Sequence, residues 1–210
     1  MTQSKTLRRW ELALLLGVAL AALLGVWLDG AQAALSDRVI RLHVLANSDS
    51  EADQALKLRV RDAVLAEAEE LFVPGAGRAE TEELLRAHLY DLAAAGAEVV
   101  GEAGYSYPVT ASLVHDYWFP TKTYTDFALP AGAYTALRIE IGAGGGQNWW
   151  CVLFPPLCLG SVSETTQETA LEAGLTENQV SLMTGEDEGY VVKFKAVELL
   201  EQFKGWLEGR

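Results

Sequence analysis

The fold of this chain depends on residues 38–64, RVIRLHVLANSDSEADQALKLRVRDAV, in which a strand and a helix meet across one turn. The first part alternates between apolar and polar residues, as a half-buried strand requires. Its apolar positions are Ile40, Leu42 and Val44. Arg41 and His43 occupy the alternate positions, so we expect them on the wetter face of the strand.

A turn and a helix N-terminus follow this strand at residues 47–50. Ser48 with Glu51, and Ser50 with Asp53, have the spacing of a capping box. The apolar stripe that predicts the helix consists of Leu56, Val60, Ala63, Val64, Ala68, Leu71 and Phe72. The basic residues expected on its wetter faces are Lys57, Arg59 and Arg61.

The rest of the chain predicts an α+β domain with a mixed sheet. A leucine-rich helical region follows residues 74–77, breaks near Asp91 or Gly96, and ends at Gly104. Strands are expected at about 107–117, 127–129, 134–141 and 149–154, the last of them central or covered on both faces. The chain should close with an amphipathic helix on Phe194, Val197, Leu200 and Leu207. We therefore expect a strand–helix–helix crossover followed by an antiparallel meander, with helices packed on the sheet.

The N-terminus has the layout of an export signal. Lys5, Arg8 and Arg9 precede an uncharged run at residues 12–28, and Ala31 and Ala33 fit a cleavage site. The run is short for a membrane span, so residues 1–35 are either a cleaved signal peptide or a retained signal anchor. Residues 36–210 are then expected to form a single domain.

Charge narrows the range of partners. Removing residues 1–35 takes away three cations and two anions, which changes the formal net charge from −13 to −14. Nucleic acids and anionic lipid surfaces would be repelled by such a body. The partners that we expect are therefore proteins or small ligands. Contact with a membrane is expected only through the N-terminal segment, if it is not cleaved.

No pattern in the sequence predicts catalysis, a cofactor or a metal site. The glycine run at 142–146 is followed by Gln147 and then a strand, whereas a phosphate-binding loop opens a helix. His43, His88 and His115 have no metal-ligand spacing. Cys151 and Cys158 are either a short-range disulfide or two buried thiols.

Two stretches are candidates for partner binding. The first is the turn and the helix after it, because loops on rigid supports often carry function. The second is a pair of aromatic-rich loops, since aromatic side chains anchor interfaces. The candidate residues are Asn47, Asp49, Asp53 and Arg61 in the first stretch, and Lys122, Thr123, Tyr124 and Asn148 in the second.

Six short segments together resemble the stage II sporulation protein R family. They are RLHVLANSDS, DQALKLRVRDAV, YPV, FPTKTY, LPAG and NWWCVLFPPLC, in that order between residues 41 and 158. The resemblance implies a non-enzymatic signal exported across the forespore membrane into the intermembrane space. There it would activate a membrane-embedded aspartic protease that processes the sigma-E precursor. The alternatives are a secreted hydrolase using Cys151 or a His–Asp pair, and a cell-wall-binding module using exposed aromatic residues.

Overall fold

The structure is a computed structural model that describes residues 10–20, 33–73, 75–124, 127–157 and 165–184. The chain divides into two units, Met1–Leu35 and Ser36–Arg210. In the first unit, residues 10–20 are helical. Across the described ranges, no helix is both long and apolar enough to cross a membrane. The helix predicted around Phe194 lies outside these ranges.

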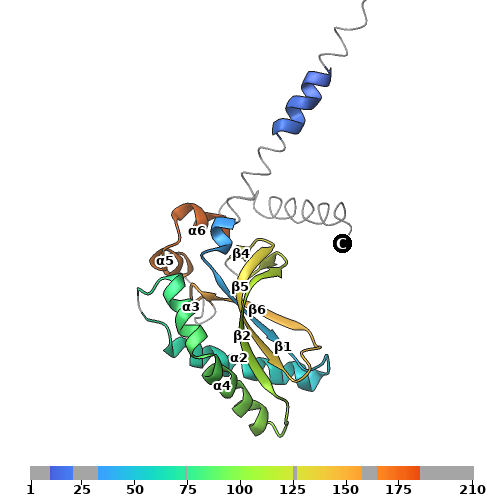
Figure 1. The fold of residues 1–210 in the computed structure, drawn as a ribbon, viewed down its shortest axis with the longest axis vertical. Coiled ribbons are helices and arrows are strands. Elements are labelled where there is room, and N and C mark those ends of the chain that lie inside the picture. The colour runs from blue at the N-terminus through green and yellow to red at the C-terminus, as the bar shows by residue number, and fades with distance from the viewer. Residues whose placement is uncertain (1–9, 21–32, 74, 125–126, 158–164, 185–210) are drawn as a thin grey trace, which may run out of the picture. The chain divides into compact units, whose positions relative to one another are not determined.

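The second unit is built on a four-stranded mixed sheet with the order β2-β5-β1-β6 (Figure 1). β1 lies between β5, to which it is parallel, and β6, to which it is antiparallel. β2 pairs antiparallel with the other side of β5. The strand bounds are β1 Ile40–Leu45, β2 Val109–Phe119, β5 Gly132–Ile141 and β6 Asn148–Phe154. A small two-stranded sheet joins β3 (Lys122–Thr123) to β4 (Ala128–Leu129).

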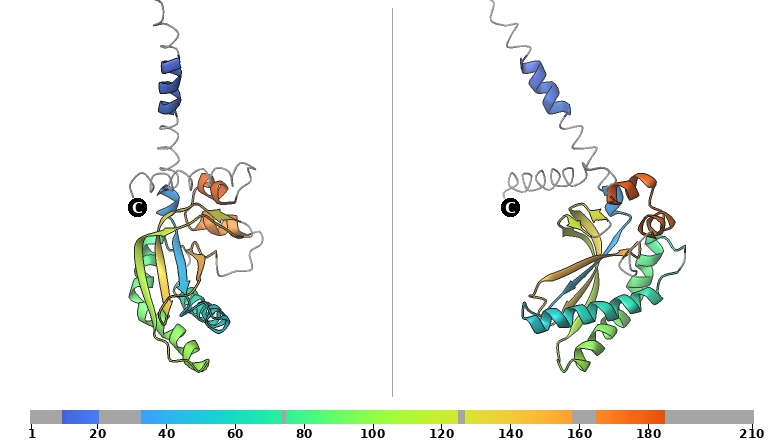
Figure 2. Two further views of the ribbon diagram at one scale, coloured as in Figure 1. Left: turned by 90° about the vertical axis from the view of Figure 1, so that its right-hand side faces the viewer. Right: turned by 180° about the vertical axis from the view of Figure 1, so that it is seen from behind.

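The helix bounds are α2 Glu51–Glu70, α3 Arg78–Ala87, α4 Leu89–Glu102, α5 Thr165–Glu172 and α6 Glu177–Thr184. α2, α3 and α4 pack on the four-stranded sheet, whereas α5 and α6 pack on each other and α6 contacts β4. The right-hand view of Figure 2 shows α2 crossing in front of the strands. The core between α2, α4 and the sheet includes Leu42, Val44, Leu56, Val60, Val64, Leu92, Val100, Leu137 and Ile139. This burial confirms the apolar stripe predicted for α2.

The α+β class and the mixed sheet are confirmed, but two details of the prediction are wrong. β6 does not lie beside β5; it pairs with β1 and forms an edge of the sheet. The helical region breaks at His88, not at Asp91 or Gly96. Gly96 lies inside α4, at a point where a Cβ would be 3.0 Å from Val109 and 3.1 Å from Val60. The glycine therefore serves close packing and does not end the helix.

Candidate functional site

The turn after β1 is held by its own polar side chains. Asp53 Oδ2 accepts hydrogen bonds from Asn47 Nδ2 (2.9 Å) and Ser48 Oγ (2.6 Å). The Asp53 backbone N–H donates to Ser50 Oγ at 3.1 Å, which makes Ser50 the N-cap of α2 as predicted. The hydrogen bonds from Ser48 and Asn47 lower the pKa of the Asp53 carboxyl. The carboxylate therefore accepts hydrogen bonds within the turn and holds its shape.

The loop between β5 and β6, residues 142–147, closes over this turn. Ala143 N donates to Asn47 Oδ1 (3.0 Å), and Gln147 N donates to Asp49 Oδ1 (2.7 Å). Gly142 has a φ of +61°, and a Cβ at this position would collide with Asn47 Oδ1. The glycine run is therefore needed for close approach, not for phosphate binding. We call residues 47–50 and 142–147 together the clamp.

Lys57 of α2 is bound to the clamp. Its ammonium group donates to Gln147 O (2.8 Å) and Gln54 Oε1 (2.6 Å). The side chain is buried, so its predicted position on a wet helix face is wrong. The physical reason is the loop from the distant β5–β6 connection, which covers the side chain and supplies an acceptor. Burial lowers the pKa of Lys57.

Arg41 and His43 are fully buried, which corrects their predicted place on a wetter face. β1 has a strand on each side, and aromatic side chains cover the face opposite α2. The Arg41 guanidinium lies 4.0 Å from the ring centre of Phe119 and 5.0 Å from that of Tyr134. These rings come from β2 and β5.

The Arg41 guanidinium has a single described hydrogen bond. Its Nη2 donates to Tyr124 Oη at 3.2 Å, while Nε and Nη1 have no acceptor among the described residues. No described carboxylate forms an ion pair with it. A buried cation normally has such a partner, so this arrangement is unusual.

His43 lies beside Arg41 on the same face. Its Nε2 is 2.8 Å from Asn148 Oδ1, and its ring centre is 5.0 Å from that of Tyr117 and 6.1 Å from that of Trp150. Burial lowers the pKa of His43, and nearby Arg138 acts in the same direction. The imidazole is therefore neutral near pH 7. We call the group of side chains of Arg41, His43, Arg138 and Trp150, on this side of the sheet, the polar face.

The structure brings only some of the predicted partner-binding residues together. Asn47, Asp49 and Asp53 meet in the clamp. Lys122, Thr123 and Tyr124 lie at the other end of β1, separated from the clamp by its six residues, roughly 20 Å. Arg61 stacks on Trp149 at 4.7 Å and pairs with Asp62, and Asn148 binds His43.

Arg41 and His43 were missed as partner-binding candidates, whereas Trp150 belongs to the aromatic stretch 148–150 that was predicted as one. Arg41 and His43 stand in the best-marked segment of the chain, but their alternation with apolar residues indicated solvent exposure. Trp150 is two positions after the candidate Asn148. No short-range pattern signals burial of β1 on both faces, because the rings that cover Arg41 and His43 come from β2, β5 and β6.

The structure does not bring Cys151 together with His43 as a hydrolase would need. Cys151 is in register with Leu42, so it faces α2, whereas His43 faces the opposite side. Cys151 is disulfide-bonded; Cys158 lies outside the described residues, so the pairing of these two cysteines stays a prediction. His88 Nδ1 is 2.9 Å from Asp91 Oδ2 at an exposed helix junction. No cluster of three or more His, Cys, Asp or Glu side chains within the described ranges could hold a metal ion.

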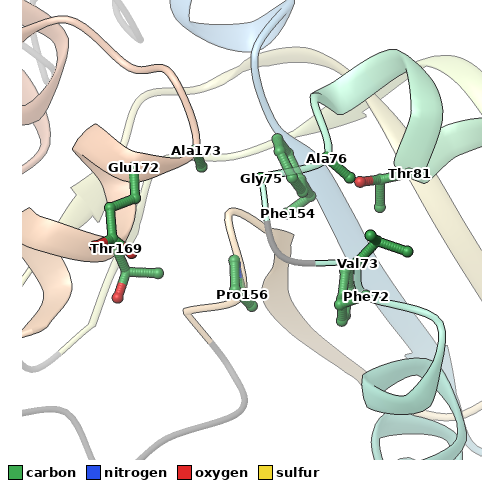
Figure 3. Close-up of a pocket in the computed structure, with 10 residues that line it drawn as sticks. All are labelled: Phe72, Val73, Gly75, Ala76, Thr81, Phe154, Pro156, Thr169, Glu172 and Ala173. Carbon is green, nitrogen blue, oxygen red and sulfur yellow. The ribbon is translucent and has the colours of Figure 1, made fainter.

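A pocket with a volume of about 210 Å³ lies between the end of α2, the start of α3, and α5 (Figure 3). Phe72, Phe154 and Pro156 form much of its apolar wall. Of the lining residues in the described part of the chain, Glu172 carries a charge, and Thr81 and Thr169 add hydroxyl groups. None of the predicted site residues lines it.

Comparison with known proteins gives one family. The family described as stage II sporulation protein R matches residues 36–164. The stage II sporulation protein R of Bacillus subtilis (strain 168) is 40% identical over 124 residues, which are 59% of this chain and 55% of that relative. The match therefore spans about half the length of the relative. No solved structure matches the chain. Because the family match covers more than half of the sequence, including the clamp and the polar face, the chain belongs to the stage II sporulation protein R family.

Proposed function

We propose that this chain is an exported sporulation signal that activates a membrane-embedded aspartic protease across the septum and so starts processing of the sigma-E precursor. Family membership carries the proposal. The six segments that suggest the family lie within the matched residues 36–164. A role in sporulation follows from the family; export and protease activation are the proposed steps.

The N-terminal sequence supports export. Lys5, Arg8 and Arg9 before an uncharged run would keep the first residues in the forespore cytoplasm. Residues 36–210 would then lie in the intermembrane space, either free after cleavage or anchored through residues 12–28. In both cases the domain can meet the outer part of a protease in the opposing membrane.

The arrangement of side chains supports recognition more than chemistry. His43 and Cys151 face opposite sides of the sheet, as described above, and the carboxylate of Asp53 is engaged inside the clamp. Trp149 and Trp150 are half-buried, which does not favour a polymer-binding row of exposed rings. The side of the sheet that holds His43 presents the exposed Asn148 beside the half-buried Trp150 and Arg138, a mixture of polar and aromatic groups suited to contact with another protein.

Coexpression in a non-sporulating host tests the proposal. The full chain, the membrane protease and the sigma-E precursor are produced together, and precursor cleavage is followed with time. We expect cleavage only when all three are present, and none when the protease lacks its catalytic aspartates. Absence of cleavage with all proteins folded and inserted would refute direct activation.

A second variant tests the transseptal step. Deleting residues 12–28 should leave a folded cytoplasmic domain that does not activate the protease, because the domain and the outer part of the protease are then on opposite sides of the membrane. Circular dichroism of the purified variant checks folding. Full activity of this cytoplasmic form would contradict signalling across the septum.

A further inference from the structure

Unmatched nitrogen atoms are concentrated on the polar face. Most of the buried side-chain polar atoms without a hydrogen-bond partner in the described part of the chain belong to Arg41, His43, Arg138 and Trp150. Arg41 lies beside Ala136 in the sheet, and His43 lies between Arg138 and Trp150. Paired residues point to the same side of a sheet, so all four side chains share the face opposite α2.

These atoms are mainly donors. Arg41 offers Nε and Nη1, Arg138 offers Nε, and Trp150 offers Nε1. A guanidinium cannot lose its charge by deprotonation, and its stacking on Phe119 and Tyr134 replaces only part of the lost hydration. Buried donors without acceptors destabilise the fold. The face is therefore complementary to an acceptor that also carries negative charge.

None of the described neighbouring groups supplies a free, negatively charged acceptor for these donors. Glu140 is already engaged by Arg138, whose Nη1 and Nη2 bind its two oxygens at 2.9 and 2.8 Å. Among the described residues, the acceptor at Arg41 is the neutral hydroxyl of Tyr124, which in turn donates to Trp150 O at 3.3 Å. Tyr124 follows β3 directly, outside the four-stranded sheet.

We propose that the polar face is the docking site for an acidic segment of the partner protein. A carboxylate of that segment reaches the buried Arg41 guanidinium by displacing the Tyr124 hydroxyl that now covers it. Trp150 Nε1 and Arg138 Nε donate to further acceptors of the same segment. This inference rests on the proposed function and adds the surface and the chemistry of the contact. Ser112, half-buried and in register with Arg138, marks the accessible side of the face.

Arg41→Met tests the charge, because methionine fills similar space without donors or charge. In the coexpression assay we expect at least a tenfold loss of precursor cleavage, while the melting temperature of the purified full chain stays equal or rises. Wild-type protein in the same assay reports on the proposed function, so the two failures are distinguishable. Unchanged cleavage by a folded Arg41→Met protein would overturn the docking proposal.

Trp150→Phe tests a single donor without removing a charge. It keeps the aromatic ring but removes Nε1–H, and we expect a several-fold loss of cleavage at an unchanged melting temperature. Trp118→Phe is the matched control, because Trp118 is 51% exposed and outside the polar face. Equal effects of the two substitutions, or no effect of either, would contradict the assignment.

Photo-crosslinking locates the partner directly. A benzoylphenylalanine replaces Ser112 on the polar face or Arg59 on the exposed side of α2, in the full chain coexpressed with the protease. We expect an adduct with the protease from position 112 and none from position 59. Adducts from position 59 alone, or adducts from position 112 only within residues 185–210 of this chain, would overturn the proposal.

Discussion

Lys57 Nζ donates a 2.8 Å hydrogen bond to the backbone oxygen of Gln147, ninety positions further along the chain. This bond ties α2 to the loop between β5 and β6. The same loop reaches the turn after β1 through Ala143 and Gln147. Three segments distant in sequence are therefore held together at one end of the sheet. A substitution that displaces one of them should also weaken the hydrogen bonds of the other two.

Gly142→Ala should lower the free energy of unfolding by about 2 kcal/mol or more. The positive φ disfavours a side chain, and the added Cβ collides with Asn47. Gly75→Ala is the control, because Gly75 also has a positive φ but open space around it, so it should lose only about 1 kcal/mol. Urea denaturation measures both losses; equal values would mean that the collision with Asn47 is relieved at no cost.

Val60→Asp should prevent accumulation of the protein. Val60 of α2 is fully buried in the core. An unpaired carboxylate there costs several kcal/mol, which is comparable to the whole stability of a domain. Leu58→Asp is the matched control on the same helix, since Leu58 is 40% exposed. The soluble yield and thermal melting of the two variants check the prediction. A Val60→Asp protein that melts like wild type would show that this face of α2 does not pack in the core.

Stability should fall as the pH is lowered below about 6.5, the value at which an exposed imidazole takes up a proton. Burial lowers the pKa of His43, so the unfolded chain binds this proton more readily than the folded protein does. Folding is therefore opposed by acid in this range and not affected by His43 at higher pH. Urea unfolding of wild type between about pH 7.5 and 5.5 measures the slope.

His43→Gln should flatten that slope, because glutamine does not titrate. His88→Gln is the control, since His88 lies at an exposed helix junction. If His88→Gln flattened the slope and His43→Gln did not, the buried imidazole would not be the group that senses acid.

Asp49→Asn distinguishes the clamp from a contact surface. Asparagine keeps an oxygen that can accept from Gln147 N, so the melting temperature should not change. We also expect wild-type activation, because the described bond of this carboxylate is to the chain's own backbone. Reduced precursor cleavage at an unchanged melting temperature would instead give the exposed charge of Asp49 a role in partner binding.

The local elements of the fold were predictable from the sequence because their signals are local. The alternation along β1, the cap at Ser50 and the stripe through Val60 each lie within a few residues of the element that they specify. The burial of Arg41 and Lys57 could not be predicted in this way. Each is covered by residues of β2, β5 or the loop before β6, and no short-range pattern encodes that contact.

The same distinction applies to the candidate site. The predicted turn exists, and the structure explains its polar residues by bonds within the clamp. The polar face was not predicted, because its members come from three strands and become neighbours only through the order β5-β1-β6. Trp150 stands opposite His43 only because β6 passes β5 to reach β1.

The central position of β1 has a consequence for how the domain forms. Ile40 pairs with Thr135 and with Phe154. The first strand of the sheet therefore cannot pair until residues about a hundred positions later have been synthesised. Contacts of such long range slow folding. During that interval Arg41 and His43 have no rings to cover them and remain hydrated, which opposes early collapse of the segment. If the domain is exported as proposed, residues 40–45 reach the far side before their partner strands, and the sheet is completed there.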